Sequence, residues 1–248
     1  MTVIDHLLFA VIAVAHPVGS YISWHRLMRR IAAGEVVSRP QLYNVTMASH
    51  WTLFGVTLAL WLGASRSWSE LGFSLDIGPW FYAGLLLSIV CFIGLAIQVR
   101  QVRAMPQDEL NAAFGELDGL EVIIPRNGNE LGRFYALSVT AGIVEETLWR
   151  GFMIWYLAHI MPAWMAGVVS AVAFGVAHIY QGAAKTPRIV VVGLVFAALY
   201  LTTGSLWLPM LVHAAVDIVQ GRIGYEAMMS REDNEPPANP DLTEDPVA

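Results

Sequence analysis

The sequence predicts an all-α membrane protein, a bundle of about seven transmembrane helices (six to eight). Apolar residues make up 56% of the 248 residues, charged residues only 14%, and the mean hydropathy is +0.55. Soluble domains normally carry about 25% charged residues. Runs of about 20 apolar residues, the length that crosses a hydrocarbon core, recur along the chain. Such a bundle uses nearly the whole length, so we expect a single transmembrane domain over residues 1–225.

The apolar runs place the expected spans in chain order at 4–24, 44–63, 79–98, 134–160, 163–180, 189–203 and 206–221. The pair His16-Pro17 interrupts the first run, because proline cannot donate a backbone hydrogen bond. Residues 100–131 are polar, and within them 107–120 has apolar residues at helical spacing. We expect that segment to lie along the membrane surface.

Loop charges predict the orientation of the bundle. The order of the expected spans places all the basic loops on the same side of the membrane. Their positive residues are Arg26, Arg29, Arg30, Arg39, Lys185 and Arg188. Cytoplasmic loops carry the excess of Lys and Arg. We therefore expect an integral protein of a bacterial cytoplasmic membrane with its N-terminus outside. Residues 226–248 hold seven acidic residues against Arg231 alone, which predicts a disordered acidic cytoplasmic tail.

A charged cluster stands in the middle of the expected span 134–160. Each charged residue at a helix centre costs roughly 2.5–3.5 kcal/mol or more, so such groups are candidates for function. Glu146 and Arg150 are four residues apart and share a helix face, which predicts an ion pair. That pair could equally be an internal salt bridge that only pins two helices. Glu145 points about 100° away around the helix and, unpaired, has the profile of a general base.

Two later spans carry further polar groups. His178 closes a Phe174-x-x-x-His178 pattern at the end of the fifth span, and His213 and Asp217 lie four apart in the seventh. Asp217 could fix the tautomer of His213. Taken singly, His178 reads as a packing residue and the His213/Asp217 pair as a satisfied pair near a helix end. Bundling the three spans would bring all these groups into one site. Three other histidines we assign to structural or interfacial positions: His16, His50 and His159.

The charges of this expected site do not balance. Glu145, Glu146 and Asp217 against Arg150 leave two negative charges if the histidines are neutral, and a membrane interior does not hold such an excess bare. A carboxyl is protonated, a histidine is charged or a cation is bound; the sequence leaves these three open.

These residue types suit the hydrolysis of an amide. Glu145 with His178 would position and deprotonate a water, and His213 would stabilise the developing oxyanion. Zinc held by His178, His213 and Glu145, with water in the open position, would serve the same reaction. The cofactor therefore stays open between none and zinc. The chain contains no His-Glu-x-x-His motif, and its single cysteine, Cys91, excludes a cysteine-based metal site.

Three motifs in order carry a family resemblance: Glu145-Glu146-x-x-x-Arg150, Phe174-x-x-x-His178 and His213-x-x-x-Asp217. They resemble the signature motifs of the CPBP (CAAX protease and bacteriocin-processing) intramembrane proteases, also called type II CAAX prenyl endopeptidase-like proteins. The resemblance covers about residues 134–221, the expected protease core. It implies that Glu145 activates water with His178 as its partner, and that Glu146 and Arg150 form a supporting ion pair.

The same resemblance implies that His213 and the residue four further on stabilise the oxyanion. That residue is commonly Asn in the eukaryotic CAAX enzymes and is Asp217 here. An ionised Asp only accepts hydrogen bonds, so Asp217 would have to be protonated or act by orienting His213.

The implied function is an intramembrane endopeptidase, of glutamate type or metal-dependent. Its expected partners are the lipid bilayer and a protein or peptide substrate, lipidated or membrane-embedded. The chain is not basic enough to predict nucleic-acid binding. One alternative is a catalytically silent immunity or scaffold protein of the same family. Another is a proton-coupled transporter that uses Glu145 and Asp217 as a relay, against which the lack of paired halves weighs.

Overall fold

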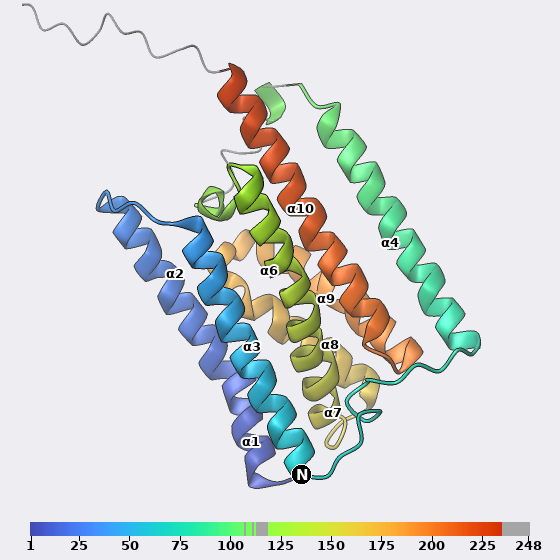
Figure 1. The fold of residues 1–248 in the computed structure, drawn as a ribbon. Helices are drawn as coiled ribbons and strands as arrows, with labels where there is room; N and C mark the ends of the chain where they lie inside the picture. The colour runs from blue at the N-terminus through green and yellow to red at the C-terminus, as the bar shows by residue number, and fades with distance from the viewer. Residues whose placement is uncertain (107, 111, 113–118, 235–248) are drawn as a thin grey trace, which may run out of the picture.

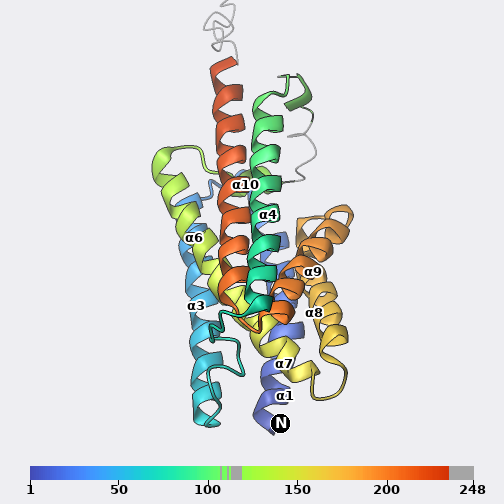
Figure 2. The same ribbon diagram turned by 90° about the vertical axis from the view of Figure 1, so that its right-hand side faces the viewer.

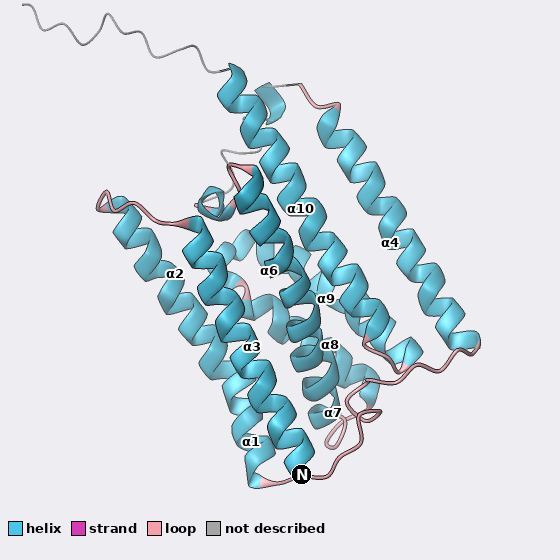
Figure 3. Cartoon of the chain, viewed as in Figure 1, coloured by secondary structure: helices cyan, strands magenta, loops and turns pink. Residues whose placement is uncertain are grey.

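The structure is a computed structural model that describes residues 1–106, 108–110, 112 and 119–234, with side chains through residue 230. Every regular element in these residues is helical, and Figure 3 shows helices joined by loops, the one between α3 and α4 being long. The fold class is therefore the predicted one, an all-α bundle. The predicted surface segment 107–120 lies largely outside the described residues.

Figure 1 gives the arrangement of the helices. In chain order they are α1 (Val3–Ala10), α2 (His16–Ala32), α3 (Arg39–Gly63), α4 (Pro79–Arg103), α6 (Gly128–Glu146), α7 (Ile154–Leu157), α8 (Ala163–Ala177), α9 (Thr186–Thr203) and α10 (Trp207–Asn234). Between them lie the π turns η1 (Val11–Ala15) and η3 (Thr147–Met153) and the 3₁₀ turns η2 (Leu120–Ile123), η4 (Ile179–Gln181) and η5 (Ala183–Lys185).

The lengths and compositions of the helices are those of an integral membrane protein. In the described part of the chain, four helical stretches are long and apolar enough to cross a membrane: Val3–Ala32, Arg39–Gly63, Pro79–Arg103 and Ala183–Thr203. Ala163–Ala177 is a shorter apolar helix. The α6–η3–α7 stretch and α10 contain the charged groups of the predicted site, as the sequence indicated.

The first span is continuous through His16-Pro17, where an interruption was expected. The helix runs over 30 residues, Val3–Ala32, and widens into the π turn η1 just before the proline. Proline has no N–H to donate to the preceding turn, and a wider turn accommodates that loss without a break. The helix therefore changes register at His16 rather than ending there.

The last helix is longer than the sequence suggested. We expected an acidic tail from residue 226, but α10 continues through Asn234; residues 235–248 lie outside the described part. Glu226 explains the extension, because it accepts hydrogen bonds from Arg222 one turn earlier and from Arg103 at the end of α4. The hydrogen bond from Arg103 lowers the pKa of Glu226 below its ordinary value.

Helices α6 and α10 pack side by side through the middle of the bundle, and α3 covers α6 (Figures 1 and 2). The approach of α6 to α10 is close because a Cβ at Gly142 would lie 2.8 Å from the Met210 carbonyl oxygen and 2.9 Å from the Ala214 nitrogen. Helices α8 and α9 form an antiparallel hairpin whose tip lies below the upper ends of α4 and α10 in Figure 2. The 15-residue α8 ends at Ala177, and His178 is its C-cap residue.

Candidate active site

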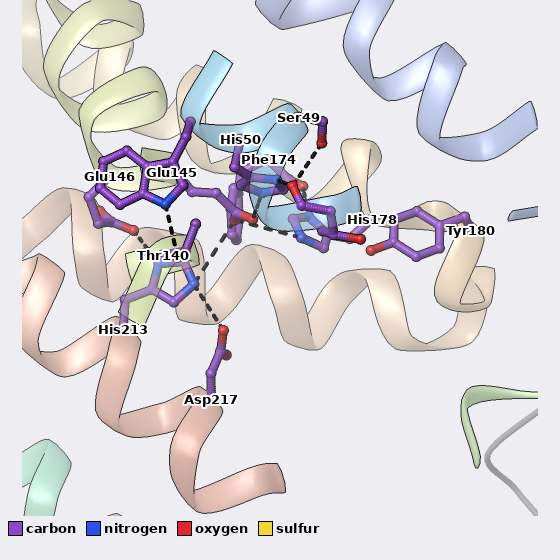
Figure 4. Close-up of polar contacts among 12 residues, drawn as sticks. Ser49, His50, Thr140, Glu145, Glu146, Phe174, His178, Tyr180, His213 and Asp217 are labelled. Atoms are coloured by element: carbon purple, nitrogen blue, oxygen red, sulfur yellow. Dashed lines mark hydrogen bonds and ion pairs between the residues drawn. The ribbon is translucent and has the colours of Figure 1, made fainter. Parts of the chain in front are cut away.

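The structure brings the three motifs together at the tip of the α8–α9 hairpin (Figure 4). Glu145 lies at the end of α6, His178 caps α8, and His213 and Asp217 come from α10. The Glu145 Oε2 atom is 3.9 Å from His178 Nε2 and 4.0 Å from His213 Nε2. Convergence of the three spans was predicted, and the distances bear it out.

Behind this centre lies a fully buried ion pair. Arg150 donates to Glu146 Oε1 at 3.0 Å, and both side chains have 0% exposure. A second arm of the guanidinium donates to the Gly193 carbonyl of α9 at 3.0 Å. The group also lies over the rings of Phe174 and Phe196. The predicted pair is thus formed, and it ties α6 to α8 and α9.

His213 is oriented by Glu146, not by Asp217 as we expected. Its Nδ1 donates to Glu146 Oε1 at 2.7 Å. Asp217 Oδ2 lies 3.7 Å from the other nitrogen, Nε2, which is too long for a hydrogen bond. The supporting carboxylate therefore has two functions, because it neutralises Arg150 and sets the direction of the His213 ring. Asp217 remains at the edge of the site with 36% of its side chain exposed.

The π turn η3 follows Glu146 directly and contains Arg150. A π turn shifts the backbone hydrogen-bond register by one residue and is frequent at functional sites. Within it, the Trp149 carbonyl accepts a hydrogen bond from the Ser170 hydroxyl of α8 at 2.6 Å. The irregular turn is therefore stabilised from outside its own helix, and it helps fix α8 beside the site.

His178 is held by its own helix. Its Nδ1 donates to the Phe174 carbonyl at 2.8 Å, which directs Nε2 toward Glu145. The Phe174 ring lies 4.5 Å away, and the Tyr180 ring stacks on the other side at 6.0 Å. The Phe-x-x-x-His spacing thus supplies both the hydrogen-bond acceptor and a packing surface for the imidazole.

One further side chain, His50 of α3, belongs to the site and was not predicted. Its Nε2 lies 3.0 Å from Glu145 Oε1, so Glu145 is not unpaired as we expected. His16 stands edge-on to the His50 ring at 5.9 Å. Assigning His16 and His50 to structural or interfacial positions was therefore wrong for His50. Its contact spans 95 residues, and no spacing rule links it to the motifs. His159 is exposed and bonds its own helix.

The hydrogen bonds of His50 limit how protons are distributed. Its Nδ1 faces the Thr46 carbonyl at 2.9 Å, and a carbonyl can only accept. Its Nε2 faces a carboxylate oxygen of Glu145. Both contacts are hydrogen bonds only if the pair holds one more proton than a neutral imidazole and an ionised carboxylate. The excess negative charge noted in the sequence is thereby reduced by one.

The side chains as placed do not form a zinc site. Among the described residues, no three His, Cys, Asp or Glu groups meet with the geometry of a metal centre. The histidines have the hydrogen-bonded Nδ1 atoms that metal ligands usually show. However, Glu145 uses one oxygen for His50, and its other oxygen lies 3.9 and 4.0 Å from His178 and His213.

An apolar groove lies along helix α8. It lies between the start of α2 and helix α8, has a volume of about 330 Å³, and is lined by small and β-branched residues, among them Ala13, Pro17, Val176 and Ala177. Ala177 directly precedes His178. The groove thus runs along exposed apolar helix surfaces, and the site histidine itself is not among its lining residues.

Comparison with known proteins agrees with the motifs. Residues 127–219 match the family model described as type II CAAX prenyl endopeptidase Rce1-like. No curated protein and no solved structure matches the chain. The matched segment includes all three motifs but not α1–α4, and hence not His50. Residues 127–219 are therefore similar to the type II CAAX prenyl endopeptidase Rce1-like domain, which confirms the resemblance over that segment.

Proposed function

We propose that this protein is a membrane endopeptidase that hydrolyses a peptide bond with a water activated by Glu145. The observation that carries the proposal is the position of Glu145 Oε2, 3.9 Å from His178 Nε2 and 4.0 Å from His213 Nε2. These separations are too long for direct hydrogen bonds and suit a bridging water. A water there touches a base and two imidazoles at once.

The reaction follows from that arrangement. Glu145 Oε2 takes a proton from the water as the water oxygen attacks the carbonyl carbon of the scissile peptide bond. The resulting oxyanion accepts a hydrogen bond from Nε2 of a doubly protonated His213, whose Nδ1 donates to Glu146. Glu145 then passes its proton to the amide nitrogen, the C–N bond breaks, and an amine and a carboxylic acid leave.

We infer that the substrate is a protein or peptide held in or at the bilayer, by its own apolar segment or by an attached lipid. The groove along α8 supports this, because its lining is apolar and it lies among exposed hydrophobic side chains of that helix. The basic residues at the end of α2 and the start of α3, together with Lys185 and Arg188 at the α8–α9 connection, support a cytoplasmic position for this end of the bundle.

The experiment compares three purified proteins in detergent and in proteoliposomes: wild type, Glu145→Gln and Glu130→Gln. The last variant makes the same change near the start of the same helix, away from the site. Each is given a library of membrane-anchored and lipidated peptides, and cleavage is read by mass spectrometry. Glu145→Gln should lower the rate by about 10²- to 10⁴-fold, and Glu130→Gln should leave it unchanged. A folded Glu145→Gln protein that cleaves like wild type contradicts the proposal.

Metal content measured on the same samples decides whether the protein uses zinc. Stoichiometric zinc in active wild type would make His178 and His213 ligands rather than water partners. A wild type that cleaves no member of the library would favour the silent immunity or scaffold role. Proton flux in the same proteoliposomes would instead indicate the transporter.

A further inference from the structure

We propose that His50 is a positioning residue for this reaction. By holding Glu145 Oε1, it turns Oε2 toward the water site between His178 and His213. The inference rests on the proposed function and adds to it a residue from α3, outside the matched segment 127–219. The N-terminal half of the chain would then complete the site of the Rce1-like domain.

The contact between His50 and Glu145 is a direct hydrogen bond, whereas the contacts of Glu145 with His178 and His213 are too long for one. In the part of the chain that the structure describes, the 3.0 Å hydrogen bond to His50 is the single direct one on the Glu145 carboxylate. His178 and His213 lie at 3.9 and 4.0 Å. Without His50 the carboxylate would be free to rotate about its last torsion, which is broad for glutamate. The base would then lose its fixed direction toward water.

His50 is itself held by two contacts besides Glu145, and the next residue helps to fix its helix. Its Nδ1 donates to the Thr46 carbonyl one turn earlier in α3, at 2.9 Å. His16 packs edge-on against its ring, and 9% of the residue is exposed. The next residue, Trp51, donates from its indole nitrogen to the Thr140 hydroxyl of α6 at 3.2 Å. This hydrogen bond joins α3 to α6 shortly before Glu145. The position of the imidazole is therefore fixed by the packing of these two helices.

The first test separates positioning from packing. His50→Leu replaces the imidazole with an apolar side chain of similar size and removes the donor, whereas the amide of His50→Gln can donate to the same oxygen. Thr57→Val is the matched control, because Thr57 is a buried polar residue of α3 that bonds only its own helix, at the Leu53 carbonyl. We expect kcat to fall about 10- to 100-fold in His50→Leu with KM little changed. His50→Gln should recover part of the loss, and Thr57→Val should match wild type.

The second test does not depend on cleavage. Thermal unfolding in detergent is measured for His50→Leu, Glu145→Gln and the double variant. Because the two side chains touch, their Tm shifts should be non-additive. Additive shifts, or a folded His50→Leu protein with unchanged kcat, overturn the inference. If the shifts are coupled but wild type cleaves no substrate, the contact exists while the proposed reaction, and the positioning role with it, is wrong.

Discussion

Gly142 offers the sharpest test of how the bundle sets the site, because its α6 backbone lies against α10. In Gly142→Ala the new Cβ would lie 2.8 Å from the Met210 carbonyl oxygen and 3.0 Å from the Ala214 Cβ. Backbone atoms cannot rotate away, so α6 and α10 must separate by roughly half an ångström. Overpacking of this kind costs about 1–3 kcal/mol. Alanine returns up to about 1 kcal/mol through its better helix propensity.

The separation would also move Glu146 away from His213, the neighbour of Ala214. A displacement of 1 Å in a catalytic arrangement can reduce the rate by about 10²-fold, so half of that predicts about a 10-fold loss. The control is Gly132→Ala on the same helix, where a Cβ meets nothing within 4 Å. That variant should be stabilised by about 0.5–1 kcal/mol and remain fully active. Tm in detergent and cleavage rate are measured for both; equal Tm values and equal rates would refute the reasoning.

Two further predictions concern ion pairs of very different burial. Arg150→Met leaves Glu146 buried without its cation and should destabilise the protein by about 3–5 kcal/mol; adding Glu146→Gln should restore part of the Tm but no activity, because His213 loses its carboxylate. Glu226→Gln should cost only about 0.2–1 kcal/mol, since Glu226 and Arg103 are partly solvated. A lowered pKa means that this contribution is fully present above the ordinary glutamate pKa and is lost as the pH falls through the lowered pKa of the folded protein. The Tm difference from wild type, measured at pH 7 and at about pH 3, should therefore be smaller at the lower pH.

Much of the fold was predictable because a bilayer requires long apolar helices. Each of the seven expected spans corresponds to a helix or a continuous run of helices. The features that were not predicted are those that no nearby residue pattern indicates. The π turn before Pro17 depends on how the helix absorbs a missing donor. The extension of α10 depends on Glu226 meeting Arg103 of another helix, across 123 residues.

The convergence of the three motifs was predictable, but individual hydrogen-bond partners within the site were predictable only where they are near in sequence. Glu146 and Arg150 stand one turn apart, so their pairing follows from helix geometry. The hydrogen bond from His213 to Glu146 spans 67 residues, and the nearer Asp217 was chosen instead. His50 was missed for the same reason. A lone histidine in an apolar helix gives no sign of which carboxylate it will meet.

The shortness of α8 has a consequence for how a substrate would be selected. Its 15 residues give a length of about 22 Å, against a hydrocarbon core of about 30 Å. The length of the helix therefore fixes the depth of His178 in the membrane. For the proposed protease, the bond that is cut is then chosen by its distance from the membrane surface as well as by the residues that flank it. One residue added to α8 would advance the imidazole by about 1.5 Å and rotate it by about 100°, out of reach of Glu145.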